Sequence, residues 1–176
     1  MRATAETITR LGLTPGIWFM PFAGTSYDPF FQDHQDWFAK DQQGKPFETT
    51  WGGTCLDMTH PGAQQHLRWV VRRIAHEWGY RFFKMDGLWT GTATRLMYVN
   101  DGYQDDQMGE ASLSNPDKTA IEAYRDGLKL VRQEAGPEVF LLGCCVSQNM
   151  RSLGGSFGLV DAMRVLAAER SFGANG

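Results

Sequence analysis

The chain has 176 residues, of which 42% are hydrophobic, and a formal net charge of −3 at pH 7. This length corresponds to one domain, and the hydrophobic fraction is sufficient for a buried core. The acidic balance, the sequence pI of about 5.8 and the lack of a basic cluster argue against a nucleic-acid partner. No run approaches the roughly 18 apolar residues of a membrane span, and no signal peptide is visible, which leaves the compartment open.

The first predicted elements are a helix and a strand. Residues 2 to 11 place Ala5, Ile8 and Leu11 at helical spacing, and Gly12 is suited to the position after the helix end. The continuous apolar run at residues 16 to 21 then has the length of a buried strand.

The same unit recurs along the chain. Pro61 suits a first helical position, and the apolar spacing predicts a helix as far as Trp78, followed at once by a strand at residues 80 to 86. A further helix is predicted from Asn115-Pro116 to Ala135. Further strands are predicted at residues 139–144 and 158–165.

Helices that alternate with continuous apolar strands predict parallel β/α units. A complete (β/α)8 (TIM) barrel needs roughly 250 residues, whereas about four β/α units can be recognised here. Met1 stands at the head of a helix with no strand before it. We therefore expect an α/β fold in which residues 1–165 form a partial (β/α)8 barrel, followed by a divergent tail at 166–176.

The connections between the predicted elements are asymmetric. Links from helix to strand are tight, whereas links from strand to helix are long, at residues 22–60, 88–115 and 145–157. Long loops at the carboxyl ends of parallel strands form the active sites of barrels. These loops carry aromatic residues that could stack on sugar rings or pack the loops over a cleft: Phe22, Tyr27, Phe30, Phe31, Trp37, Trp51, Trp89, Tyr98 and Tyr103.

Lys84 and Asp86 end the second predicted strand and are two positions apart. Side chains two apart in a strand point to the same face, so an ammonium and a carboxylate should lie together at its carboxyl end. An ordinary strand with a charged end is the alternative.

Other chemistries fit the sequence poorly. The four histidines lack the spacing of a zinc site, and the three cysteines are not arranged as a metal cluster. The acidic loop at residues 100–106 breaks the EF-hand pattern, and the glycine-rich stretch at 154–158 lacks the lysine of a P-loop. We expect no metal and no cofactor.

Five segments resemble, in order, the catalytic barrel of the α-galactosidases of glycoside hydrolase family 36, in clan D. They are Gly16-Ile17-Trp18 with Pro21-Phe22, His34 to Trp37, Leu56 to Pro61, Gly79 to Asp86, and Leu142-Gly143-Cys144 with Gly158 to Arg164. The resemblance runs from about residue 2 to Val165. It implies that the four predicted strands are the third to sixth of the barrel.

The resemblance implies a retaining glycosidase that acts on terminal α-galactosides through a covalent glycosyl-aspartate. Asp86 matches the nucleophile. Lys84 matches a lysine that contacts sugar hydroxyls, and a cation there should lower the pKa of Asp86. Trp51 and Cys144 match residues that line the galactose site. Arg164 matches an arginine that binds the substrate and orients the acid/base.

The sequence departs from the family directly after Arg164. The family places its acid/base aspartate four residues later, where this chain has Ala168. Glu169 is a weak candidate for the role because it lies one residue late. Asp161 matches a family aspartate before the arginine and is expected to be structural.

Three functions stay open on the sequence alone. The first is a retaining α-galactosidase of which this chain is an incomplete and inactive part. The second is a non-catalytic or vestigial half-barrel that binds carbohydrate, consistent with the missing acid/base. The third is a related α-N-acetylgalactosaminidase. In each case the expected partner is a carbohydrate; self-association is possible, and the sequence gives no sign of membrane binding.

Overall fold

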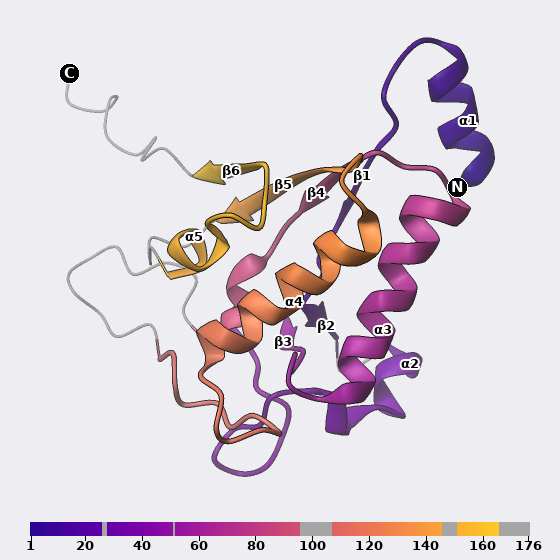
Figure 1. Ribbon diagram of the computed structural model, residues 1–176. Coiled ribbons are helices and arrows are strands. Elements are labelled where there is room, and N and C mark those ends of the chain that lie inside the picture. Colours follow the sequence, from indigo (N-terminus) through magenta and orange to yellow (C-terminus); the bar gives the residue numbers. More distant parts are fainter. Residues whose placement is uncertain (26–27, 51, 96–106, 146–150, 166–176) are drawn as a thin grey trace, which may run out of the picture.

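The computed structural model describes residues 1–25, 28–50, 52–95, 107–145 and 151–165. Its centre is a four-stranded parallel sheet with the strand order β1-β4-β5-β6 (Figure 1). The strands are β1 (Gly16–Phe19), β4 (Phe82–Met85), β5 (Phe140–Cys145) and β6 (Ala162–Val165). The strand order follows the chain, as in a segment of a (β/α)8 barrel, so the predicted α/β partial barrel is confirmed.

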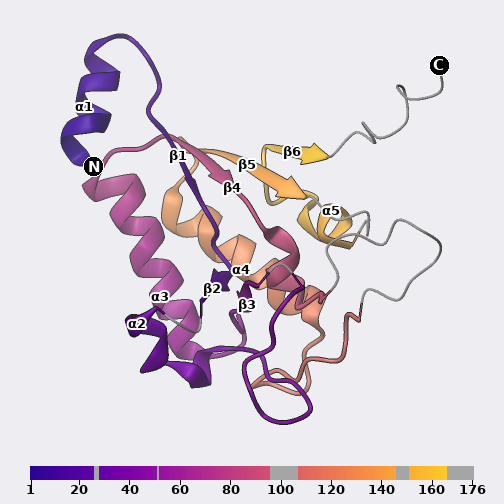
Figure 2. The ribbon, with the colours of Figure 1, turned by 180° about the vertical axis from the view of Figure 1, so that it is seen from behind.

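Two long helices cover one face of this sheet. They are α3 (Pro61–Arg72), which continues into a π-helical turn at Arg73–Glu77, and α4 (Ala120–Ala135). In Figure 1 they lie in front of the strands, and from behind the strands are seen uncovered (Figure 2). No helix in the described part of the chain has both the length and the apolar character needed to cross a membrane.

The core forms between the sheet and these helices because both contribute an apolar face. The contributing side chains, all at most 1% exposed, are Phe83 and Met85 of β4, Leu141 of β5, Leu67 and Val71 of α3, and Leu128 and Val131 of α4. Full burial of each such side chain contributes about 1.5–3 kcal/mol. The alternate residues of the strands point to the other face, which these helices leave open.

The remaining elements lie at the start of the chain and in the long connections. They are α1 (Arg2–Arg10), the antiparallel pair β2 (Ala23–Gly24) and β3 (Thr54–Cys55), α2 (Pro29–Gln32), the 3-10 turns η1 (Gln35–Trp37) and η3 (Leu88–Thr92), and α5 (Arg151–Ser156). Apart from α1, each is too short to leave a periodic pattern, and none of these short elements was predicted.

Several loop aromatics belong to the core. Phe22 is fully buried and meets the edge of the Tyr124 ring at a centroid distance of 5.5 Å. Gly127 of α4 lies so close that a Cβ there would stand 2.6 Å from Phe22 and 2.8 Å from Met58. The missing side chain of Gly127 therefore lets α4 approach the loop after β1, and Phe22 packs the loop rather than facing a ligand.

The predicted start of α4 at Asn115-Pro116 is wrong by about four residues. The helix begins after Thr119, whose hydroxyl accepts the backbone N–H of Glu122, while the Glu122 carboxylate accepts the N–H of Thr119. Such a capping box satisfies two of the free N–H groups of a helix end. Asn115 instead accepts the N–H of Asp117 at 3.0 Å, which holds a turn outside the helix.

Candidate active site

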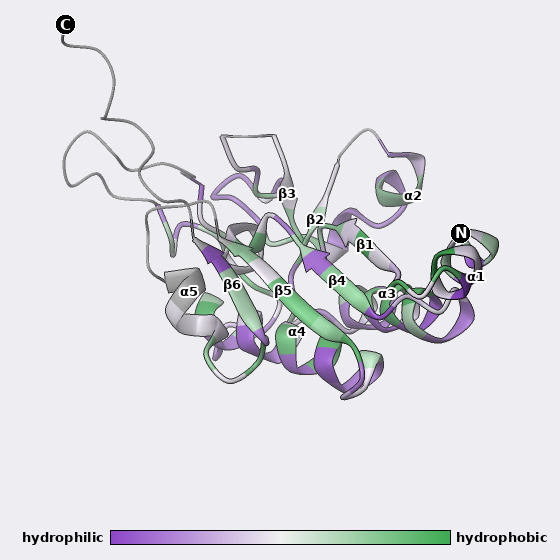
Figure 3. Cartoon of the chain, turned by 90° about the horizontal axis from the view of Figure 1, so that it is seen from above, coloured by the Kyte–Doolittle hydropathy of each residue, from purple (hydrophilic) through white to green (hydrophobic). Residues whose placement is uncertain are grey.

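The open face of the sheet is assembled by strand register. Trp18 of β1 pairs with Lys84 of β4, and Lys84 pairs with Leu142 of β5, so the three side chains stand in one row. Below them the Phe82 and Phe140 rings stack at 5.2 Å. Lys84 is half-buried and Trp18 is 54% exposed. Figure 3 shows hydrophilic colour at the carboxyl ends of β4 and β6, where a second row of side chains begins.

Asp86 directly follows β4 and lies at the centre of this second row, which also contains Cys144 and Arg164. Its Oδ2 accepts a 2.9 Å hydrogen bond from the indole Nε1–H of Trp18, and its Oδ1 accepts the backbone N–H of Gly87, also at 2.9 Å. The Asp86 N–H donates to the Phe19 carbonyl at 3.0 Å, which continues the pairing with β1. Gly87 has a φ of 63°, where a side chain is strained, and a Cβ would stand 2.1 Å from Met20.

The contacts continue from Asp86 across the sheet. The buried Cys144 thiol of β5 hydrogen-bonds the Asp86 carboxylate. Arg164 of β6, the register partner of Cys144, donates from Nη1 to the Cys144 sulfur at 3.4 Å. Trp18, Asp86, Cys144 and Arg164 thus form a continuous chain of contacts across all four strands.

These contacts decide the charge of Asp86. Burial raises the pKa of the Asp86 carboxyl. The hydrogen bonds from Trp18, the Gly87 N–H and Cys144 lower it, and the charge of Lys84 lowers it further. Together these contributions outweigh burial, so the pKa of Asp86 is below its ordinary value. The pKa of the Cys144 thiol is raised, chiefly by burial, which favours the neutral form that can donate. The site therefore presents an ionised carboxylate held from both neighbouring strands.

Within residues 1–25, 28–50, 52–95, 107–145 and 151–165, no three His, Cys, Asp or Glu side chains are grouped as a metal site requires.

The structure brings most of the predicted site residues together. Asp86, Cys144 and Arg164 are linked by contacts, and Lys84 lies on the same face. Trp51 and Glu169 lie outside the described residues, as does the whole predicted tail 166–176.

Trp18 is the residue of the site to which sequence reasoning gave no role. Its contact with Asp86 follows from the register of β1 against β4, in which Trp18 is aligned with Lys84, and the sequence alone gives no signal for that register. Asp161 has the structural role expected of it. Its Oδ2 accepts the Leu141 N–H at 2.7 Å and the Arg132 guanidinium at 2.6 Å.

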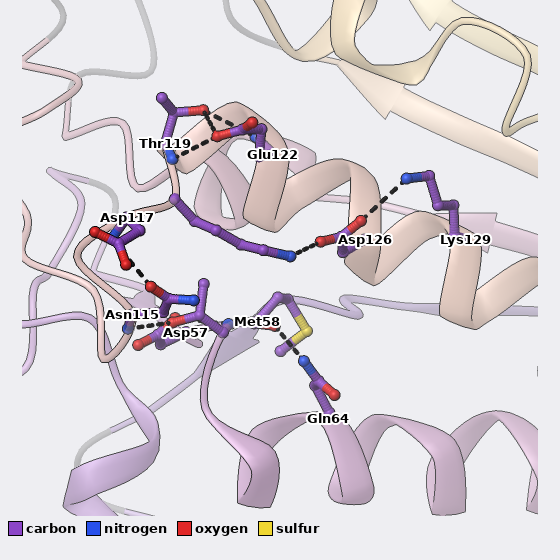
Figure 4. A network of polar contacts seen from close by, with 11 residues as sticks. Asp57, Met58, Gln64, Asn115, Asp117, Thr119, Glu122, Asp126 and Lys129 are labelled. Carbon is purple, nitrogen blue, oxygen red and sulfur yellow. Dashed lines mark hydrogen bonds and ion pairs between the residues drawn. The ribbon is translucent and has the colours of Figure 1, made fainter.

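A buried aspartate fixes the loops that precede both covering helices. Asp57 accepts the N–H and the hydroxyl of Thr59 on Oδ1, at 2.8 and 2.6 Å, and the N–H of Ser114 on Oδ2. Figure 4 shows this region beside the capping box of α4. Helices that return antiparallel to the strands begin at the strands' carboxyl ends, so Asp57 orders the loops on the side of the sheet that carries Asp86.

Solved structures share this fold. The α-galactosidase TtGalA from Thermus thermophilus, in complex with p-nitrophenyl α-D-galactopyranoside, is 27% identical with a TM-score of 0.69, over 93% of this chain and 29% of its own. The GH36 α-galactosidase AgaA A355E from Geobacillus stearothermophilus, in complex with 1-deoxygalactonojirimycin, is 14% identical with a TM-score of 0.64, over 93% and 21%. The glycoside hydrolase domain of PelA from Pseudomonas aeruginosa is 17% identical with a TM-score of 0.60, over 93% and 55%.

No protein-family model matches the sequence. The chain spans less than a third of the length of the α-galactosidases above, and about half of the PelA domain. Ordered sequence segments, strand order and the solved structures agree: the chain has the fold of part of a glycoside hydrolase barrel, and the family that it resembles is the GH36 α-galactosidases.

Proposed function

We propose that this chain is part of the catalytic barrel of a retaining α-galactosidase and that Asp86 is its nucleophile. The observation that carries the proposal is the position of the Asp86 carboxylate at the carboxyl end of β4, where hydrogen bonds from Trp18 and Cys144 hold it and lower its pKa. A retaining glycosidase needs a charged carboxylate in a fixed position at the sugar's anomeric carbon. The likeness to TtGalA, described with an α-galactoside bound, supports galactose as the sugar.

The reaction assigns a role to each neighbouring group. An Asp86 oxygen attacks the anomeric carbon, and the bond to the leaving oxygen breaks as a second carboxyl, roughly 5 to 5.5 Å away, protonates that oxygen. Water then releases the sugar and restores the carboxylate. Lys84 would bind sugar hydroxyls from the same face. Trp51 and Cys144 would line the pocket, and Arg164 would orient the acid/base.

The acid/base is the part that this sequence lacks at the family position, which holds Ala168. Glu169 is displaced by one residue, and a catalytic carboxylate must be placed within about 0.5 Å. We therefore propose that this chain by itself does not hydrolyse unactivated galactosides such as raffinose or stachyose.

The nucleophile can be tested without the acid. The leaving group of 2,4-dinitrophenyl α-D-galactopyranoside departs without protonation, so incubation with the chain should leave one galactosyl ester, located on Asp86 by peptide mass spectrometry. Asp86→Asn should abolish the ester, whereas Asp117→Asn, at an exposed position, should keep it. An ester on another residue, or an undiminished ester in Asp86→Asn, would refute the assignment.

Two further arms separate the alternatives. The corresponding N-acetylgalactosaminide should react more slowly; faster esterification by it would favour the α-N-acetylgalactosaminidase. Ala168→Asp should allow turnover of p-nitrophenyl α-D-galactopyranoside if the acid/base is all that is missing. Binding of galactose without any ester formation would instead favour a non-catalytic carbohydrate-binding half-barrel.

A further inference from the structure

We infer that Trp18 is a positioning residue for Asp86, holding the carboxylate in the orientation from which it attacks. The inference rests on the proposed function, because it assigns Trp18 a part in the same reaction. Its basis is the 2.9 Å hydrogen bond from the Trp18 indole to Asp86 Oδ2, made between neighbouring strands 68 positions apart in the chain.

The contacts of Asp86 leave its carboxylate little rotational freedom. The Gly87 N–H holds Oδ1, and the Trp18 indole holds Oδ2 from the β1 side. The Cys144 thiol approaches from β5, on the opposite side of β4. A nucleophile fixed on both sides loses little freedom on reaching the transition state, and a misplacement of about 1 Å can slow such a step about 100-fold.

Packing does not account for Trp18. More than half of its side chain is exposed, whereas the tryptophan of η3, Trp89, is 3% exposed and sits in the interior. The indole N–H is a donor only, so it favours the carboxylate over the neutral acid. When water releases the sugar and Asp86 regains its charge, the indole N–H of Trp18 would stabilise the carboxylate that forms. Trp18 should therefore matter for the release step as well as for the attack.

The contact is tested first without substrate. In the full chain labelled with ¹⁵N, the Trp18 indole signal, assigned by its loss in Trp18→Phe, should shift with pH at a midpoint below the ordinary aspartate value. Asp86→Asn should abolish that shift, while Trp69→Phe, which removes an indole that is 51% exposed on α3, should preserve it. An indole signal that ignores pH, or shifts equally in Asp86→Asn, would overturn the inference.

The consequence for the reaction is tested with the dinitrophenyl galactoside. Trp18→Phe should form the galactosyl ester at least about tenfold more slowly than Trp69→Phe, and the ester should also persist longer. Circular dichroism and denaturation of both variants separate this effect from misfolding. Equal rates in the two variants would overturn the role of Trp18 while leaving Asp86 as the nucleophile. If no variant forms an ester, the proposed function fails, and the indole titration still decides whether Trp18 holds Asp86.

Discussion

The carboxylate of Asp57 accepts a 2.6 Å hydrogen bond from the backbone N–H of Ser114, 57 positions further along the chain. The same side chain is 1% exposed and accepts two hydrogen bonds from Thr59. One buried carboxylate therefore joins the loop before α3 to the loop before α4.

Asp57→Ala should lower the free energy of unfolding by about 2–4 kcal/mol, because it leaves buried donors without an acceptor. Urea denaturation followed by circular dichroism measures the loss. Asp33→Ala, at an exposed position beyond α2, is the matched control and should stay within about 0.5 kcal/mol of the unaltered chain. Equal effects of the two substitutions would contradict the anchoring role of Asp57.

Lys84 was expected from the sequence to lower the pKa of Asp86, and it does contribute. The hydrogen bond from Trp18 has the larger effect on that pKa. Lys84→Ala should therefore raise the pKa of Asp86 less than Trp18→Phe does. Carboxyl ¹³C titration by NMR measures both changes. A larger increase in Lys84→Ala would show that charge, and not the indole, dominates at this site.

Glu134 of α4 bridges two arginines of α3, with the contact to Arg68 at 2.6 Å and a second to Arg72. Burial raises the pKa of Glu134, but the bonds from Arg72 and Arg68 outweigh it and the pKa is lowered. Stability from this group is therefore present above the ordinary pKa of 4.5 and lost as pH falls through the lowered value.

At neutral pH, Glu134→Gln should cost about 1–3 kcal/mol, measured by urea denaturation. The difference from the unaltered chain should shrink steadily below about pH 4.5. Glu77→Gln removes an exposed partner 3.8 Å from Arg73 and should cost less than about 0.5 kcal/mol at either pH. A pH-independent effect of Glu134→Gln would contradict the ionic origin of its stability.

Gly127→Ala should destabilise the chain by about 1–2 kcal/mol, although alanine favours helices by about 1 kcal/mol over glycine. The added Cβ would overlap Phe22 and Met58, at 2.6 and 2.8 Å. Gly154→Ala, a helical position with no atom within 4 Å of the added Cβ, should be neutral or stabilising. Thermal melting of both variants checks the contrast, and a stabilising Gly127→Ala would contradict the close packing.

The sequence was sufficient for the main sheet because its strands are continuous apolar runs between helices with periodic stripes. Boundaries were less accurate: the strand expected at residues 158–165 forms only at Ala162–Val165. The start of α4 was misplaced although Thr119 and Glu122 carry the capping-box pattern. The pair β2 and β3 has two residues per strand and leaves no alternation to detect.

The candidate site, like the fold, could be predicted from the sequence only in part. That Lys84 and Asp86 share a face follows from strand geometry, and the parts of Cys144 and Arg164 came from the family resemblance. The contact between Trp18 and Asp86 depends on the register of β1 against β4, which local sequence does not determine. The roles given to Trp51 and Glu169 stay predictions, because both lie outside the described residues.

The contact chain from Trp18 to Arg164 also protects the alignment of the strands. A shift of β4 by a single position would turn Asp86 toward α3 and α4, placing a charge among apolar side chains. The Trp18 indole and the Cys144 thiol would then both lose the Asp86 carboxylate. The groups proposed for sugar chemistry thus also penalise misaligned pairing, so substitutions among them should increase slipped or aggregated species during refolding, even under conditions in which no sugar is present.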